Sequence, residues 1–198
     1  MKSVAIIVAA GLSSRMGKFK PLLPFNKEPT IVYLTQKFFN AGVGHVIIVT
    51  GHRSEDLMAA CSDLESLTFI KNEAYATTQM LDSAVLGIKE AQAMGADHIL
   101  FTPVDVPLIA EETIRLVMEA PGKIVFPTYG GQQGHPLKLD QNYFNSIVDF
   151  KGQGGMRGAI DALNAPIAYL EVEDPFIFKD MDTPEDYRSL LNKVQRKS

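Results

Sequence analysis

The sequence has little of what marks disulfide-rich, membrane or nucleic-acid-binding proteins. Its single cysteine, Cys61, excludes an internal disulfide framework and a cysteine-cluster metal site. No charged segment followed by a long apolar run opens the chain, because its first apolar run, Val4–Ala9, has the length of a strand. The net charge is −4, and no basic run precedes the C-terminal tail. We therefore expect a cytoplasmic protein without a nucleic-acid or membrane-surface role.

The remaining composition is that of a folded globular protein. Hydrophobic residues make up 46% and charged residues 21% of the 198 residues, and there are no internal repeats or low-complexity segments. This length suits one domain, 1–198, and can bury a substantial core. The amino-acid composition changes near Tyr129, after which glycines become frequent. We therefore expect a half with regular secondary structure, 1–128, and a loop-rich half, 129–198.

Short β-branched runs alternate with helical patterns along the chain, which is typical of a parallel sheet covered by helices. Strands are predicted at Val4–Ala9, His45–Thr50, Leu67–Lys71, His98–Thr102, Lys123–Thr128 and Ala168–Val172. Helices are predicted at Thr30–Ala41, Ser54–Cys61, Gln79–Met94, Glu111–Ala120, Asn142–Phe150 and Met156–Leu163, with a last helix beginning at Pro184 after Thr183. The predicted fold class is α/β, Rossmann-like, with a mostly parallel sheet and helices on both faces.

Open sheets of this kind bind ligands beyond the carboxyl ends of their strands. The segment after the first predicted strand contains Gly11 and the basic residues Arg15, Lys18 and Lys20. Backbone N–H groups and positive charge at one place favour a polyphosphate. The other segments at this edge are Thr50–Arg53, Asn72 and Pro103–Pro107. The sequence therefore predicts a nucleotide site at this edge.

Two common phosphate-binding loops do not fit. A Walker A loop has four residues before its Gly-Lys pair and then Ser or Thr, whereas five residues separate Gly11 from Gly17 and Phe19 follows Lys18. The dinucleotide fingerprint needs three spaced glycines and an acidic residue after the second strand, and that strand is followed by Gly51-His52-Arg53. An NADP enzyme is therefore a remote alternative.

The first loop and several later motifs resemble the MobA-like nucleotidyltransferases. The motifs are Ala9-Ala10-Gly11-Leu12-Ser13-Ser14-Arg15-Met16-Gly17 with Lys20 and Leu22-Leu23-Pro24, then Thr50-Gly51-His52, Pro103-Val104-Asp105-Val106-Pro107, Gly134-His135-Pro136, and Asp180-Met181-Asp182-Thr183-Pro184-Glu185-Asp186. The resemblance implies the nucleotide-diphospho-sugar transferase type of fold, with a nucleotide-binding half at 1–128 and an acceptor-binding half at 129–198. Ala9-Ala10-Gly11 resembles the cytidylyl branch, and the methyl group of Ala10 would narrow the space beside a base. One departure is Gln79, where the family often has glycine, and this difference is expected to affect how the base or ribose is held.

The resemblance also implies roles for individual residues. Arg15, Lys20 and Asp105 are the expected catalytic residues, and Asp105 and Asp182 the expected Mg²⁺ ligands. The expected nucleotide contacts are Ala9, Ala10, Gly11, Arg15, Lys20, Thr50, Asn72, Ser83 and Asp105. His135 and Arg157 are the expected acceptor contacts.

The implied reaction is Mg²⁺-dependent transfer of CMP from CTP to the phosphate of molybdopterin, with release of pyrophosphate. A phosphate monoester is largely ionised at neutral pH, its second pKa being about 6, so its oxygen needs no general base. Charge neutralisation and alignment are then the main tasks of the protein. Open alternatives are a guanylyl donor, a sugar phosphate or choline phosphate acceptor, and a nucleotide-binding protein without turnover. The protein is expected to be a monomer or homodimer, and transient contact with molybdoenzymes is a further expectation.

Overall fold

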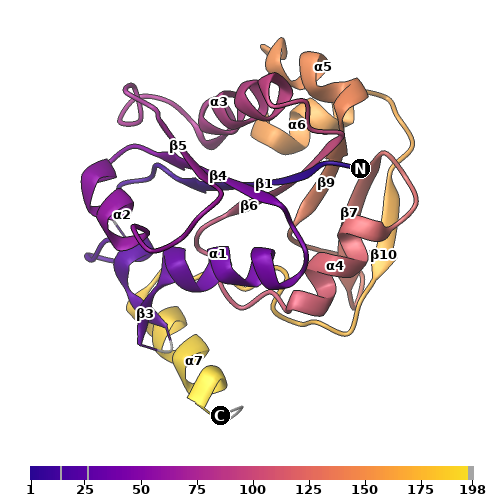
Figure 1. Ribbon diagram of the computed structural model, residues 1–198. Coiled ribbons are helices and arrows are strands. Elements are labelled where there is room, and N and C mark those ends of the chain that lie inside the picture. Colours follow the sequence, from indigo (N-terminus) through magenta and orange to yellow (C-terminus); the bar gives the residue numbers. More distant parts are fainter. Residues whose placement is uncertain (14, 26, 196–198) are drawn as a thin grey trace.

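The computed structural model describes residues 1–13, 15–25 and 27–195, and its centre is one mixed sheet (Figure 1). The strand order is β10-β7-β9-β6-β1-β4-β5, and β8 pairs with β7. The strands are β1 (Ser3–Ala9), β4 (His45–Thr50), β5 (Leu67–Lys71), β6 (His98–Pro103), β7 (Ile124–Tyr129), β8 (Gln132–Gln133), β9 (Leu137–Asp140) and β10 (Ala168–Glu171). β1 is parallel to β4 and β6, and β4 is parallel to β5. The predicted α/β class with a mostly parallel sheet is confirmed.

Two helical layers cover the sheet because the buried strands carry apolar residues on both faces. The helices are α1 (Thr30–Asn40), α2 (Ser54–Ala60), α3 (Met80–Ala93), α4 (Glu111–Glu119), α5 (Phe144–Val148), α6 (Gly155–Ala162) and α7 (Pro184–Gln195). In β1, Ala5 and Ile7 pack in the core under α1, α2 and α4, whereas Val4 and Ile6 pack under α3, α5 and α6. The two layers lie on opposite faces of the sheet in Figure 1.

A third apolar cluster holds α7 away from the sheet layers. It joins Phe25 of the hairpin β2 (Pro24–Phe25) and β3 (Glu28–Pro29) to Leu190 of α7, with Met16, Leu108 and Met181 between them. Met181 is fully buried. This cluster therefore brings together the loop after β1, the loop after β6 and the segment before α7.

The main differences from prediction lie in short elements. β9 lies in the predicted loop-rich half and pairs antiparallel with both β6 and β7, so this part of the sheet is mixed. The helix expected at Asn142–Phe150 is only Phe144–Val148, because a 3-10 turn (Gln141–Tyr143) precedes it. The hairpin β2–β3 and the strand β8 were not predicted either. In the described residues, no helix has the length and apolar character needed to cross a bilayer.

Candidate active site

A cavity of about 280 Å³ lies at the carboxyl ends of β1 and β6. Because these strands are adjacent and parallel, the loops that follow them meet at the same edge of the sheet. The turn before α3 closes a third side. The residues that line the cavity are Val8, Ala9, Ala10, Gly11, Ser13, Lys20, Pro21, Tyr75, Thr78, Gln79, Met80, Ser83, Pro103, Val104 and Asp105.

The loop after β1 folds back so that Lys20 faces this cavity. Ser13 has a left-handed backbone, with φ 55°, and its carbonyl accepts a hydrogen bond from the N–H of Met16 at 3.1 Å. The Ser13 hydroxyl accepts a second one from the N–H of Lys20, also at 3.1 Å. A short 3-10 helix, Lys20–Leu22, begins at this point, with Pro21 at its start. These contacts fix the position of the lysine.

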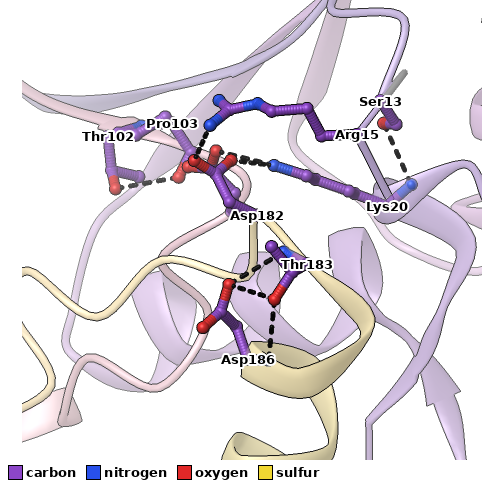
Figure 2. Close-up of polar contacts among 9 residues, drawn as sticks. Ser13, Arg15, Lys20, Thr102, Pro103, Asp182, Thr183 and Asp186 are labelled. Atoms are coloured by element: carbon purple, nitrogen blue, oxygen red, sulfur yellow. Dashed lines mark hydrogen bonds and ion pairs between the residues drawn. The ribbon is translucent and has the colours of Figure 1, made fainter. Parts of the chain in front are cut away.

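Lys20 lies between two carboxylates that come from distant parts of the chain. Its Nζ is 2.5 Å from Oδ1 of Asp182 and 3.3 Å from Oδ2 of Asp105. Arg15 Nη1 lies 2.8 Å from the other oxygen of Asp182, and Figure 2 shows both cations pointing at this carboxylate. The Lys20 side chain is only 11% exposed, whereas that of Arg15 is 73% exposed. A buried ion pair is screened little by solvent, so the contacts of Lys20 are the stronger ones.

Backbone contacts join the segments that carry the two carboxylates. The N–H of Met181 donates to the carbonyl of Asp105 at 2.9 Å. Next to it, the Thr183 hydroxyl and the Asp186 carboxylate form a reciprocal cap at the start of α7 (Figure 2). The positions of Asp105 and Asp182 therefore depend on main-chain contacts that a side-chain substitution at Asp105 leaves in place.

The carboxylate pair has the chemistry of a partial site for a divalent cation. Mg²⁺ is commonly bound by one or two carboxylates together with substrate phosphate oxygens and water. No group of three or more His, Cys, Asp or Glu side chains suited to a metal occurs among the described residues, so a cage built from protein alone is absent there. Burial, followed by the charges of Asp182 and Asp105, raises the pKa of Asp180. The carboxylates of Asp180, Asp182 and Asp105 therefore lie close enough to influence one another.

The structure brings most, but not all, of the predicted nucleotide contacts to this cavity. Ala9, Ala10, Gly11, Lys20, Ser83 and Asp105 line it, and Arg15 lies beside it on Asp182. Thr50 and Asn72 do not line it. Thr50 is fully buried and its hydroxyl contacts that of Ser54 at 2.7 Å, whereas Asn72 lies behind the turn before α3.

Sequence reasoning missed the wall that this turn provides. Tyr75, Thr78 and Met80 line the cavity. Gln79 lines it too, and this residue was expected to affect how the base or ribose is held. One residue in the sequence, Gly51, could have indicated this wall. A Cβ atom at Gly51 would lie 2.5 Å from Cβ of Tyr75 and 2.7 Å from the carbonyl oxygen of Ala10, so only glycine lets these two walls approach.

The predicted acceptor residues lie away from this cavity. The ring of His135 packs edge-on against Phe101, with 6.2 Å between ring centroids, and its backbone N–H donates to the carbonyl of Ile177 at 2.7 Å. Arg157 pairs with Asp161 at 3.0 Å and also bonds to Gln133. Burial lowers the pKa of His135 to about 4, so its imidazole is neutral at pH 7 and adds no charge for an anion. The acceptor roles of both residues stay predictions.

His135 should make folding stability depend on pH. Its pKa is about 4 when folded and 6.5 in the reference state, so the unfolded chain takes up the proton first as the pH falls. The free energy of unfolding should therefore drop by about 2 kcal/mol between pH 7 and pH 5 through this residue. Urea unfolding of the wild type and of His135→Phe at both pH values measures the effect. If the stability difference between the two proteins is independent of pH, the prediction is wrong.

Comparison with known proteins identifies the same family that the sequence motifs resemble. The sequence profile described as "MobA-like NTP transferase domain" matches residues 5–167. The chain is 29% identical over 184 residues to the molybdenum cofactor cytidylyltransferase of Escherichia coli K12, covering 92% of each chain. A nucleotidyl transferase from Methanothermobacter thermautotroptrophicus has the same fold, with a TM-score of 0.86, 22% identity and 99% of each chain covered. Rv0371c from Mycobacterium tuberculosis H37Rv, solved in complex with manganese, has a TM-score of 0.74 at 21% identity, covering 97% of this chain and 99% of that one.

Proposed function

The chain belongs to the MobA-like NTP transferase family and is a nucleotidyltransferase, and we propose that it transfers CMP from CTP to the phosphate of molybdopterin. One observation carries the proposal: Lys20 and two carboxylates from distant segments meet at a cavity formed by the loops after β1 and β6. This arrangement suits a triphosphate with its divalent cation. The preference for CTP is supported by Ala9-Ala10-Gly11 and by the similarity to a cytidylyltransferase.

The proposed reaction forms one P–O bond and breaks another. An oxygen of the acceptor phosphate attacks the α-phosphorus of CTP. The bond from that phosphorus to the bridging oxygen breaks, and its electron pair leaves with pyrophosphate. Because the acceptor phosphate is already largely ionised at neutral pH, no side chain has to remove a proton. Turnover therefore does not require a catalytic base among the residues that line the cavity.

Asp105 and Asp182 are the residues that would hold Mg²⁺, which would neutralise charge on the triphosphate when bound. Lys20 then supplies its ammonium group to the oxygens of the α-phosphate, where negative charge develops. Arg15, which is more exposed and lies outside the cavity wall, is suited to the leaving pyrophosphate. The carboxyl end of β1, at Ala9 and Ala10, contributes a rigid wall for the nucleoside.

The proposal is tested by giving the purified protein a choice of substrates. CTP and GTP are incubated separately with Mg²⁺ and molybdopterin, and pyrophosphate release is followed. We expect CTP to react at least about tenfold faster, which corresponds to about 1.4 kcal/mol of selectivity. Choline phosphate and a sugar phosphate in place of molybdopterin identify the acceptor class. Equal rates with both triphosphates, or release that does not depend on molybdopterin, would contradict the proposal.

A further inference from the structure

Asn72 forms a complete set of side-chain hydrogen bonds directly behind the cavity wall. It follows β5 and is only 5% exposed. Its Nδ2 donates to the hydroxyl of Thr78 at 2.8 Å and to that of Ser83 at 2.9 Å. Its Oδ1 accepts from the backbone N–H of Ala74 at 3.0 Å. Both amide hydrogens are therefore used inside the protein.

The orientation of this amide follows from its partners. A backbone N–H can only donate, so the atom facing Ala74 must be the amide oxygen, and the two hydroxyls must face the NH₂ group. The Thr78 hydroxyl donates to the carbonyl of Ala74 at 3.0 Å, which leaves it to accept from Asn72. The directions of all these hydrogen bonds agree with one another.

Ser83 is left with one hydrogen to donate. Its oxygen accepts from Asn72, and the described residues provide no acceptor for its O–H group. Ser83 is 3% exposed and lines the cavity. A buried hydroxyl that cannot use its hydrogen in the protein is stabilised by an acceptor on a ligand.

We propose that Asn72 is a positioning residue that holds Ser83 as a hydrogen-bond donor to the nucleoside part of the substrate. The segment from Tyr75 to Ser83 contributes only uncharged side chains to the cavity lining, Tyr75, Thr78, Gln79, Met80 and Ser83, whereas the charged lining residues, Lys20 and Asp105, come from the loops after β1 and β6. The acceptor is therefore an uncharged oxygen of the nucleoside, either the base carbonyl or a ribose hydroxyl. This inference rests on the proposed function, because it assumes that the cavity binds a nucleoside triphosphate. It also replaces the expectation that Asn72 itself contacts the nucleotide.

The test is a double-mutant cycle on CTP binding. Ser83→Ala removes the donor, and Asn72→Asp offers Ser83 an internal acceptor, so the hydroxyl turns away from the cavity. Each change should raise the Kd for CTP about tenfold, as measured by calorimetry, and should lower kcat less than threefold. Because both act through one hydroxyl, the double variant should bind about as weakly as either single variant.

Two further arms complete the experiment. Thr77→Val is the matched control, since Thr77 is exposed, does not line the cavity and donates its hydroxyl to the carbonyl of Ala74, and the Kd of this variant should change less than threefold. If Ser83→Ala weakens binding of CTP but not of 2′-deoxy-CTP, the acceptor is the ribose 2′-hydroxyl, whereas equal weakening identifies the base. An unchanged Kd in Ser83→Ala, or additive effects of the two changes, overturns the inference. If the wild type binds no nucleoside triphosphate, the proposed function itself fails as well.

Discussion

Replacing Asp105 by asparagine is expected to lower the rate of pyrophosphate release by about 10²- to 10³-fold while the protein stays folded. The amide has the same shape as the carboxylate but lacks its charge, and it is a weaker ligand for a hard divalent cation. The fold should tolerate the change because the Met181 N–H still finds the carbonyl of residue 105. The side chain is also partly exposed, at 23%. Steady-state rates at saturating Mg²⁺, together with circular dichroism, measure both effects.

Asp63→Asn is a matched control for this prediction. Asp63 is an exposed aspartate after α2, outside the cavity-lining residues, so the same chemical change there should leave turnover within about twofold. A wild-type protein that binds CTP without turnover would favour the alternative of a nucleotide-binding protein. Near-wild-type turnover in Asp105→Asn would exclude this residue as a metal ligand.

Replacing Lys20 by methionine should change two measured quantities in opposite directions. Turnover should fall by about 10²- to 10³-fold, because the charge beside the α-phosphate is lost. Without nucleotide, however, the variant should bind Mn²⁺ about tenfold more tightly than the wild type. The lysine ammonium contacts both carboxylates in the structure, so a divalent cation has to compete with it for them. Pyrophosphate release and electron paramagnetic resonance of Mn²⁺ measure the two effects.

Lys18→Met is the matched control, since Lys18 is exposed and does not line the cavity. Both quantities should change less than threefold in this variant. A Lys20→Met protein that binds Mn²⁺ more weakly than the wild type would show that the lysine does not compete with the metal. A fall in turnover together with a rise in Mn²⁺ affinity also distinguishes a local electrostatic role from general destabilisation, because destabilisation would weaken both turnover and Mn²⁺ binding.

The sequence predicted the regular part of the fold because its periodicities are strong there. The first strand, Val4–Ala9, is apolar throughout and lies in the structure at Ser3–Ala9, between two parallel neighbours. β9 could not be predicted in the same way. It has only four residues, and its strand conformation depends on pairing with β6 and β7, which are distant in sequence.

The site was predictable to the level of its sheet edge, but not to the direction of each side chain. Asp105 and Lys20 were expected at this edge because each lies in a segment that follows a strand of the parallel sheet, and both line the cavity. Asn72 also follows a strand, yet its amide turns behind the wall to bond Thr78 and Ser83. Such directions depend on tertiary hydrogen bonds. Lys20 and Asp182 lie 162 residues apart in the sequence, so only the resemblance to a family placed both in one site, and their direct contact was not predicted.

The central claim, that Asp105 and Asp182 bind a divalent cation together with the nucleotide, is tested most directly by Mn²⁺ binding in the presence of CTP. Electron paramagnetic resonance titrations compare the wild type with the Asp105→Asn, Asp182→Asn double variant. We expect CTP to increase the affinity of the wild type for Mn²⁺, and we expect the double variant to lose at least about tenfold in that affinity. Equal Mn²⁺ binding by the two proteins at saturating CTP would contradict the account.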